Sequence, residues 1–251
     1  DATTVSLAAL DDWASAYRDS PVQVHRLSDL GELSCEPVDS DRARERWETL
    51  LDTEHFLGSG PLVGRRLRYR VRSEHFGDVA ALAFSAPARR LYARDAWIGW
   101  DDASRGEDLE RIVCNSRFLV RGQLRVPGLA SHVLATVLAR LPDDWARVYG
   151  QAPVLVETFV DRRRHRGGCY RAANWTYLGD TAGRGRNDRH HAVEAGVKAI
   201  YVYPLIGIGV VNFRRLPMPH GDRTPTTGAV APVCRRYTPQ AGGATGETPE
   251  E

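Results

Sequence analysis

A cysteine and a tyrosine stand side by side in the segment RGGCYRAANWTYLG, residues 166–179. A cysteine thiolate is a nucleophile, and a tyrosine hydroxyl can give up a proton to a leaving group. Cys169 and Tyr170 are therefore candidates for covalent or acid–base catalysis. Free cysteine is also among the most buried residue types, so a core position for Cys169 is the alternative.

A catalytic Cys169 would need a lowered thiol pKa. Positive charges and a helix start both lower it, and the segment predicts a helix start at Gly167–Gly168. Three arginines surround the cysteine in the sequence: Arg164, Arg166 and Arg171.

Either reaction also needs a base, and two side chains are candidates. His132 falls in the first turn of a long predicted helix, and Glu157 lies inside the apolar stretch VLVETFVD. A carboxylate in an apolar strand requires a cleft or a charged partner, so an ion pair with an arginine is the alternative for Glu157.

Two arginine-rich segments could bind anions. The loop GRGRNDRHH, residues 183–191, is either an anion clamp or a solvated loop. The segment RRLRYRVR, residues 65–72, predicts a strand with a basic face that either follows a phosphate backbone or faces water. The proposed clamp consists of Arg184, Arg186 and Arg189.

The composition narrows the class of protein. The chain has 251 residues, of which 42% are hydrophobic, and a formal net charge of +2 that does not by itself call for nucleic acid or a membrane. The four cysteines form no C-x-x-C pair, so we expect no metal site. No apolar run is long enough to cross a membrane, and no basic leader precedes one, so we expect a cytoplasmic protein with free thiols.

The patterning predicts an α/β (α+β) fold with a central mixed sheet flanked by helices. We expect an N-terminal extension at 1–39, a catalytic domain at 40–205 and a largely irregular C-terminal extension at 206–251. Apolar periodicity predicts helices at 5–18, 39–56, 104–112, 127–150 and 164–174, and strands at 62–73, 77–86, 113–126, 153–161, 175–181 and 198–205.

Two fragments resemble signatures of the GNAT acetyltransferase family. RVPGLA supplies Arg125, Gly128 and Ala130 of that family's R/Q-x-x-G-x-G/A phosphate-binding turn. Tyr170, followed by Asn174, corresponds to the tyrosine that protonates the leaving thiolate of coenzyme A in many members. The chain departs from the pattern because Pro127 removes one N–H group and Asn174 replaces a glycine.

A longer resemblance covers residues 40–205. The fragments RVPGLASHVLA, VLVETFVD, RGGCYRAANW and GDTAGRGRNDRHH are similar to the Druantia anti-phage DruA family, whose domain also occurs fused to transposases. This resemblance implies a GNAT-like core more firmly than it implies a reaction.

These patterns favour an acyltransferase that takes acyl-CoA, or a phosphopantetheine thioester on an acyl carrier protein, as co-substrate, with a role in specialised metabolism. The donor would lie against Gly128–Ser131, so Ser131 belongs to its site. The acyl group would pass to a small-molecule acceptor, directly or through Cys169. Arg171 and Asn174, with the predicted clamp, would bind substrate or phosphate. The alternative is a nucleic-acid-associated anti-phage or transposon-related module that binds phosphates through its arginines.

Overall fold

A computed structural model of the chain describes residues 26–181 and 196–205. The chain divides into two units, residues 1–213 and 214–251, and every described residue belongs to the first. The helix predicted at 5–18, the arginine-rich loop at 183–191 and most of the C-terminal extension lie outside the described residues.

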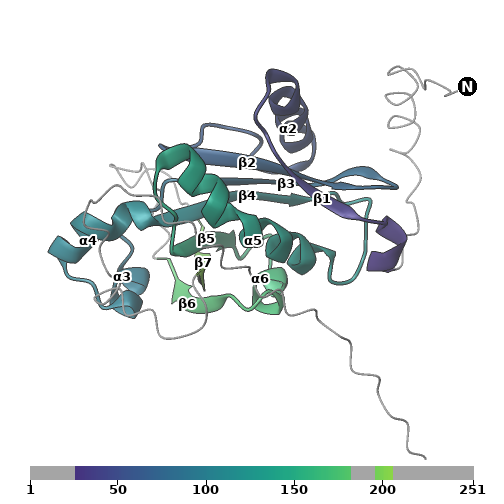
Figure 1. Ribbon diagram of the computed structural model, residues 1–251. Helices are drawn as coiled ribbons and strands as arrows, with labels where there is room; N and C mark the ends of the chain where they lie inside the picture. Colours follow the sequence, from purple (N-terminus) through teal and green to yellow (C-terminus); the bar gives the residue numbers. More distant parts are fainter. Residues whose placement is uncertain (1–25, 182–195, 206–251) are drawn as a thin grey trace, which may run out of the picture. The chain divides into compact units, whose positions relative to one another are not determined.

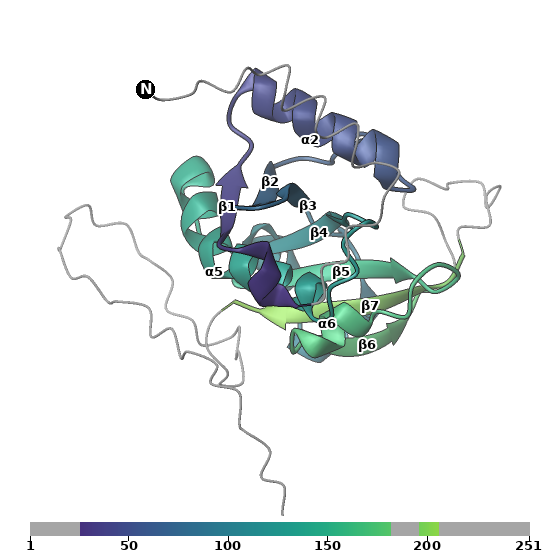
Figure 2. The same ribbon diagram turned by 90° about the vertical axis from the view of Figure 1, so that its right-hand side faces the viewer.

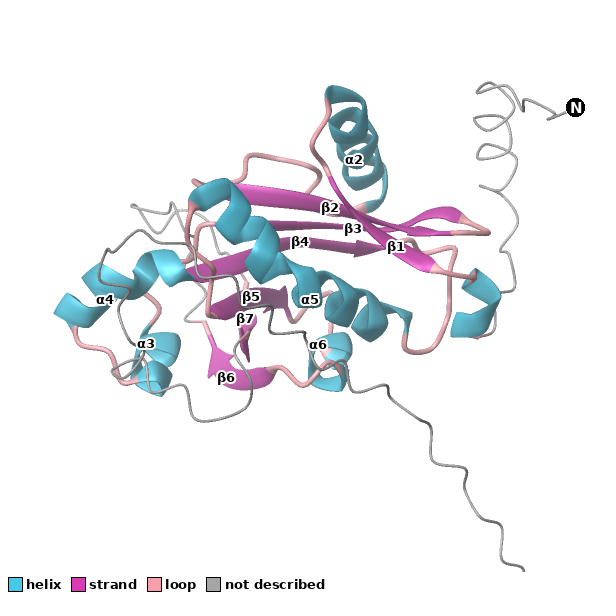
Figure 3. Cartoon of the chain, viewed as in Figure 1, coloured by secondary structure: helices cyan, strands magenta, loops and turns pink. Residues whose placement is uncertain are grey.

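A seven-stranded sheet forms the centre of this unit, with strand order β1-β2-β3-β4-β5-β7-β6 (Figures 1 and 3). The β4–β5 pair is parallel and each other neighbouring pair is antiparallel. Helices flank the sheet, and the predicted fold class is confirmed. The strands are β1 Leu33–Pro37, β2 Arg66–Ser73, β3 Gly77–Ser85, β4 Ile112–Val120, β5 Leu155–Asp161, β6 Thr176–Asp180 and β7 Lys198–Pro204.

The two longest described helices cover opposite faces of the sheet (Figure 2). Strand β3 shows why, since it alternates large and small side chains. Leu82 and Phe84 pack in one cluster with α5 (Leu129–Tyr149), whereas Ala81 and Ala83 pack in a second cluster with α2 (Asp41–Glu54). The small alanines leave room for Trp47 of α2, whose indole N–H donates to the Leu82 carbonyl at 3.0 Å. This strand is buried on both faces, as its continuous apolar run predicts.

Helix α5 makes the parallel pair possible, because parallel strands need a long crossover and α5 connects β4 to β5. It begins two residues after Pro127, close to the predicted start. Its apolar stripe is buried against the sheet and includes Val133, Leu134, Val137, Leu138 and Leu141.

The remaining helices are short. They are α3 Tyr92–Ile98, α4 Asp102–Asp108 and α6 Gly168–Ala172, with 3-10 turns at Leu27–Leu30 and Leu109–Arg111. Helix α6 covers only the middle of the predicted segment 164–174.

Strand β1 was not predicted. Its sequence LSCEP is short and ends in proline, and it lies in the segment that we assigned to the N-terminal extension. It pairs with β2 over five residues and forms an edge of the sheet, where proline is tolerated. Strand β4 ends at Val120, earlier than predicted, because Gln123–Val126 lead into α5 without joining the sheet.

Replacing Leu134 of α5 by alanine tests this packing. The side chain is fully buried between α5 and the sheet, so Leu134→Ala should lower the free energy of unfolding by about 2–5 kcal/mol. Urea denaturation measures the change. Val148→Ala on the same helix is the matched control, since Val148 is 55% exposed and should change stability far less. Equal losses in the two variants would contradict the burial of α5 described here.

Candidate active site

The strands β4 and β5 separate from one another part-way along their length. Their pairing runs from Ile112 opposite Leu155 to Asn115 opposite Thr158, and no later pair joins the two described strands. The register of β4 against β3 shifts at the same place. Asn115 lies opposite Phe84 and Arg117 lies opposite Ala83, so Ser116 forms a bulge. A bulge bends a strand and ends regular pairing. The sheet therefore opens between the last residues of β4 and β5.

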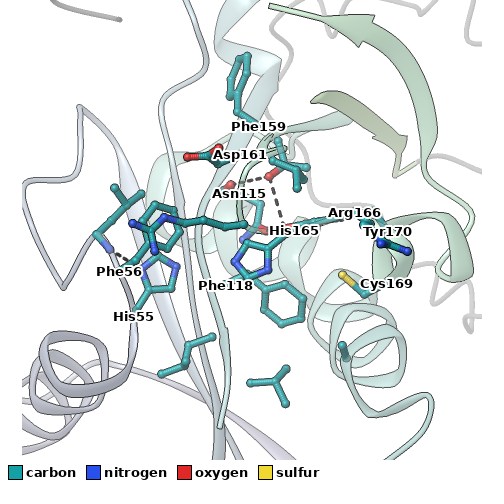
Figure 4. A pocket seen from close by; sticks show the side chains of 18 of the residues that line it. His55, Phe56, Asn115, Phe118, Phe159, Asp161, His165, Arg166, Cys169 and Tyr170 are labelled. Carbon is teal, nitrogen blue, oxygen red and sulfur yellow. Dashed lines mark hydrogen bonds between the residues drawn. The ribbon is translucent and has the colours of Figure 1, made fainter. Parts of the chain in front are cut away.

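A cleft of about 930 Å³ occupies this opening (Figure 4). Its walls come from both strands, from the end of α2 and the residues after it, from the segment 164–167 and from α6. His55 and Phe56 lie on one side in Figure 4, and Cys169 and Tyr170 lie on the other. The cleft therefore joins residues that are more than 100 positions apart in the sequence.

Asn115 and Tyr170 meet at the inner end of the cleft. The Tyr170 hydroxyl donates to Asn115 Oδ1 at 3.1 Å, and Thr158 Oγ1 lies 3.5 Å from the Tyr170 oxygen. The Asn115 amide donates to the Ala83 and Arg117 carbonyls at 3.2 and 3.0 Å. These two acceptors fix the amide orientation, so its oxygen faces the tyrosine. The β4 bulge thus positions the Tyr170 hydroxyl.

Aromatic rings hold Tyr170 in place. Its ring stacks on Tyr201 at a centroid distance of 5.7 Å and meets Trp175 and Phe118 edge-on at 5.0 and 6.0 Å. Burial raises the pKa of the Tyr170 hydroxyl above its usual value. The hydroxyl is consequently protonated at neutral pH, as a proton donor must be.

Cys169 lines the same cleft, but its thiol is not activated. Burial raises its pKa, and this effect outweighs the lowering by Arg171 and by peptide N–H groups at the start of α6. The predicted lowering of the Cys169 pKa is therefore wrong. Of the three arginines near it in the sequence, only Arg171 is shown to act on the Cys169 thiol, and the sequence cannot show that the cysteine side chain is half-buried against the apolar core.

A second cavity of about 280 Å³ lies at the start of α5. It shares Ala130, Gly168 and Cys169 with the larger cleft. Gly128 and Ser131, at the start of α5, also line it. Helix starts leave backbone N–H groups without helical partners. The Leu129 N–H bonds to the Val126 carbonyl, whereas the Ser131 hydroxyl donates to the Gly128 carbonyl.

Glu157 does not line either cavity. Its side chain is fully buried and bonds to Arg94 at 2.7 Å and to the Ala88 N–H at 2.6 Å. Arg94 is also fully buried and pairs with Asp95. Of the two alternatives for Glu157, the structure contains the ion pair, which ties α3 to β5.

Several other predicted site residues lie outside the two cavities. His132 and Arg125 are exposed near the start of α5, and Asn174 is exposed with a φ of 62° after α6. The guanidinium of Arg171 donates to the Tyr201 hydroxyl at 3.1 Å. The predicted clamp of Arg184, Arg186 and Arg189 lies outside the described residues.

The basic face predicted on β2 is largely occupied. Arg70 pairs with Glu36 at 2.8 Å and with Asp78 at 3.0 Å, and Arg72 pairs with the same two carboxylates. The Arg68 guanidinium lies over the Trp47 ring of α2. Of the four arginines predicted along that strand face, Arg66, Arg68, Arg70 and Arg72, the last three are thus engaged within the protein.

Sequence reasoning missed the residues at the α2 side of the cleft. His55 stacks on Phe56 at a centroid distance of 4.9 Å, and Phe56 lies 6.2 Å from His165. Burial, Arg117 and His165 together lower the pKa of His55 to about 4. No local signal marks His55, which follows the end of α2 and stands far from the start of β4 at Ile112 in the sequence. His165 stands in the segment HRGGCY and could have been noticed.

The family model of the Druantia protein DruA matches residues 25–206 of the chain. The chain belongs to the DruA family. The match includes strand β1 and all the described elements of the cleft, and it agrees with the resemblance seen in the sequence. No curated protein matches this DruA family member.

Solved structures similar to this DruA family member include enzymes named as acetyltransferases and an N-acyl amino acid synthase. The three described here are 8–10% identical to the chain. Spermidine N-acetyltransferase from Vibrio cholerae in its dodecameric intermediate state has a TM-score of 0.35, with 56% of this chain and 65% of that chain covered. The chain thus spans just under two-thirds of that enzyme. The same enzyme in complex with CoA and spermine gives 0.43, with 69% and 95% covered, and FeeM, an N-acyl amino acid synthase from uncultured soil microbes, gives 0.40, with 69% and 91%.

Two further findings apply to the described part of this DruA family member. None of its helices is both long and apolar enough to cross a membrane. Its His, Cys, Asp and Glu side chains form no group of three or more that could hold a metal ion.

The raised pKa of Cys169 predicts slow alkylation. Iodoacetamide at pH 7.5 should modify Cys169 more slowly than it modifies N-acetylcysteine, and the rate should keep rising with pH above 9, because the thiolate is the reacting form. Peptide mass spectrometry measures the rate, and Cys169→Ser identifies the peptide. Fast labelling that does not change between pH 6 and 8 would show a stable thiolate instead.

The ion pair of Glu157 predicts a structural effect. Glu157→Gln removes one partner of a buried pair and should lower the free energy of unfolding by about 3–5 kcal/mol. Asp180→Asn is the matched control, since its pair with Arg162 is at the surface and contributes about 0–1 kcal/mol. A Glu157→Gln protein of unchanged stability would contradict this assignment.

Proposed function

We propose that this DruA family member transfers an acyl group from a thioester to a small-molecule amine. The observation that carries this proposal is the position of the Tyr170 hydroxyl. It is protonated, fixed by Asn115, and carried by a side chain that lines the cleft next to the cavity at the start of α5. The two cavities together offer one site for a long donor and another for an acceptor.

The start of α5 fits the phosphates of acyl-CoA or of a carrier's phosphopantetheine. Ala130 and Ser131 occupy the second and third helical positions, whose N–H groups have no helical acceptor. The positive end of a 21-residue helix favours an anion there, and no acidic residue in the first turn opposes it. Gly128 has a φ of 81°, which glycine adopts without strain, and Arg125 is exposed beside it.

The donor thioester would reach the cleft past Cys169, which borders both cavities. The acceptor nitrogen attacks the thioester carbonyl carbon, and the carbon–sulfur bond breaks. Tyr170 gives its proton to the departing thiolate. His165, which lies between the two walls of the cleft in Figure 4, takes the proton that the amine loses.

Direct transfer is favoured over a covalent acyl-Cys169 intermediate, because a thiol with a raised pKa is a poor nucleophile at neutral pH. Cys169 then serves as a wall of the donor passage. Neither His132 nor Glu157 lines the cleft, so we do not assign the base to them. An acyl carrier protein, a role in specialised metabolism and a cytoplasmic location stay predictions from the sequence. So does phosphate binding by residues 183–191, on which the nucleic-acid alternative now depends.

The Tyr170→Phe variant tests this proposal. It removes the proton donor but keeps the aromatic packing, so kcat should fall by about 100-fold or more. The measurement is thiol release from a panel of acyl-CoAs and acyl-carrier thioesters with mixed amines. Tyr149→Phe is the matched control, since its hydroxyl bonds to the Arg66 backbone at the far end of α5.

Intact-protein mass spectrometry during the same assay separates the two reaction schemes. Direct transfer predicts acylated amine, no stable protein adduct and an active Cys169→Ala variant. An acyl adduct that Cys169→Ala abolishes would establish the two-step scheme instead. Unchanged turnover in Tyr170→Phe, or no thiol release from any donor, would overturn the proposed function.

A further inference from the structure

The Tyr170 hydroxyl faces an acceptor while it is protonated. It donates to Asn115 Oδ1 at 3.1 Å, and the Asn115 amide nitrogen is committed to the Ala83 and Arg117 carbonyls. The amide therefore cannot turn its N–H groups toward Tyr170 without leaving both carbonyls. Once Tyr170 has given up its proton, its oxygen and Asn115 Oδ1 are two acceptors that face each other.

A tyrosinate oxygen in this place needs a hydrogen-bond donor. The Tyr170 ring lies among Tyr201, Trp175 and Phe118, so water has little access to it. A buried anion without a donor is far more costly than one that accepts a hydrogen bond. How readily Tyr170 gives up its proton therefore depends on what its oxygen can accept afterwards.

Thr158 carries a hydroxyl that can supply this bond. Its Oγ1 lies 3.5 Å from the Tyr170 oxygen, and it donates to the Asn115 backbone carbonyl at 2.9 Å. A hydroxyl has one proton, so it donates fully to one of these acceptors at a time and changes between them by rotation. Among the hydrogen bonds of the described residues, no other group donates to the Tyr170 oxygen.

The end of the parallel pair places Thr158 at the cleft. It lies opposite Asn115 in the last pair between β4 and β5, and its side chain lines the cleft although only 2% of the residue is exposed. Val156 and Val160, two residues away on either side, belong to the apolar cluster beneath α5. Valine has nearly the same shape as threonine, so the hydroxyl is what distinguishes this position from its neighbours.

The ionisable groups around Tyr170 do not replace this donor. Burial raises the pKa of the Tyr170 hydroxyl, Cys169 and Cys114 raise it further by their charge, and the hydrogen bond from Thr158 acts in the opposite direction. Arg171, the next residue in the chain, donates to a different tyrosine hydroxyl. Thr158 is thus the group that favours the charged form of Tyr170.

We propose that Thr158 is a positioning residue for acyl transfer, whose hydroxyl turns from the Asn115 carbonyl to the Tyr170 oxygen as the proton leaves. This inference rests on the proposed function and adds the group that stabilises the tyrosinate. The O–H bond of Tyr170 breaks as the S–H bond of the departing thiol forms, and Thr158 keeps its own proton. Tyr170 then takes a proton from solvent, and His165 releases to solvent the one it took from the amine.

The Thr158→Val variant tests the inference. With acyl-CoA as donor, kcat should fall about 10-fold or more with little change in KM, because a hydrogen bond to a charged group is lost in the transition state alone. Thr158→Ser keeps a hydroxyl and should recover most of this loss. Ser73→Ala is the matched control, since it removes another buried hydroxyl, which bonds to the Leu30 carbonyl outside the cleft, and should keep the wild-type kcat.

A change of leaving group separates proton supply from a loss of structure. 4-Nitrothiophenol is an acidic thiol that departs without a proton, whereas the alkyl thiol of CoA is a poorer leaving group. Thr158→Val and Tyr170→Phe should both lose activity with acyl-CoA and keep it with the same acyl group on 4-nitrothiophenol. The ratio of the two rates in one sample does not depend on how much protein is folded, and Thr158→Ala gives the same comparison if the valine variant is unstable.

The outcomes distinguish the inference from the proposed function. No loss with acyl-CoA in Thr158→Val, or equal losses with the two donors, would overturn the inference and leave Thr158 with a structural role alone. A donor-dependent loss in Tyr170→Phe would keep the proposed function intact in both cases. Unchanged turnover of acyl-CoA by Tyr170→Phe would overturn the proposed function and this inference with it.

Discussion

The short parallel contact between β4 and β5 is the constraint on which the site depends. It lasts for four residue pairs, and the bulge at Ser116 then turns β4 away while β5 continues along β7. A sheet that stayed paired to its end would have no cleft. The same bulge fixes the Asn115 amide, which in turn orients the Tyr170 hydroxyl. The opening of the sheet and the position of the proposed proton donor thus have a single origin.

Arginine has two distinct roles in this chain, in which Lys198 is the single lysine. On β2 and in the Arg94–Glu157 pair, guanidinium groups are buried or paired and hold elements together. Around the cleft, Arg164 and Arg166 are exposed, and Arg164 acts on Asp161 through its charge. A count of arginines cannot separate these roles, since only burial and the positions of the carboxylates distinguish them.

The sequence predicted most of the fold, because long apolar periodicities such as those of β3 and α5 depend on local spacing. It also predicted one cleft for Ala130, Cys169 and Tyr170, and all three line the same cleft. This was possible because the order of the motifs along the chain fixes which strand and helix ends carry them. It missed β1, whose five residues carry too little pattern, and it misjudged the Cys169 pKa, because burial of a side chain depends on which helical face meets the core. His55 and Phe56 could not be foreseen, as tertiary packing alone brings the end of α2 to β4.

The two walls of the cleft belong to different hydrophobic clusters. The wall with Tyr170 and Cys169 is built on the cluster beneath α5, whereas α2, whose end carries His55 and Phe56, is anchored through Trp47 and Leu51 on the opposite face of the sheet. The two clusters meet across strand β3, with Leu82 and Phe84 in one and Ala81 and Ala83 in the other. A substitution that shifts the seat of α2 would therefore act on the wall with His55 and Phe56 directly, and on the wall with Tyr170 through the shared strand β3.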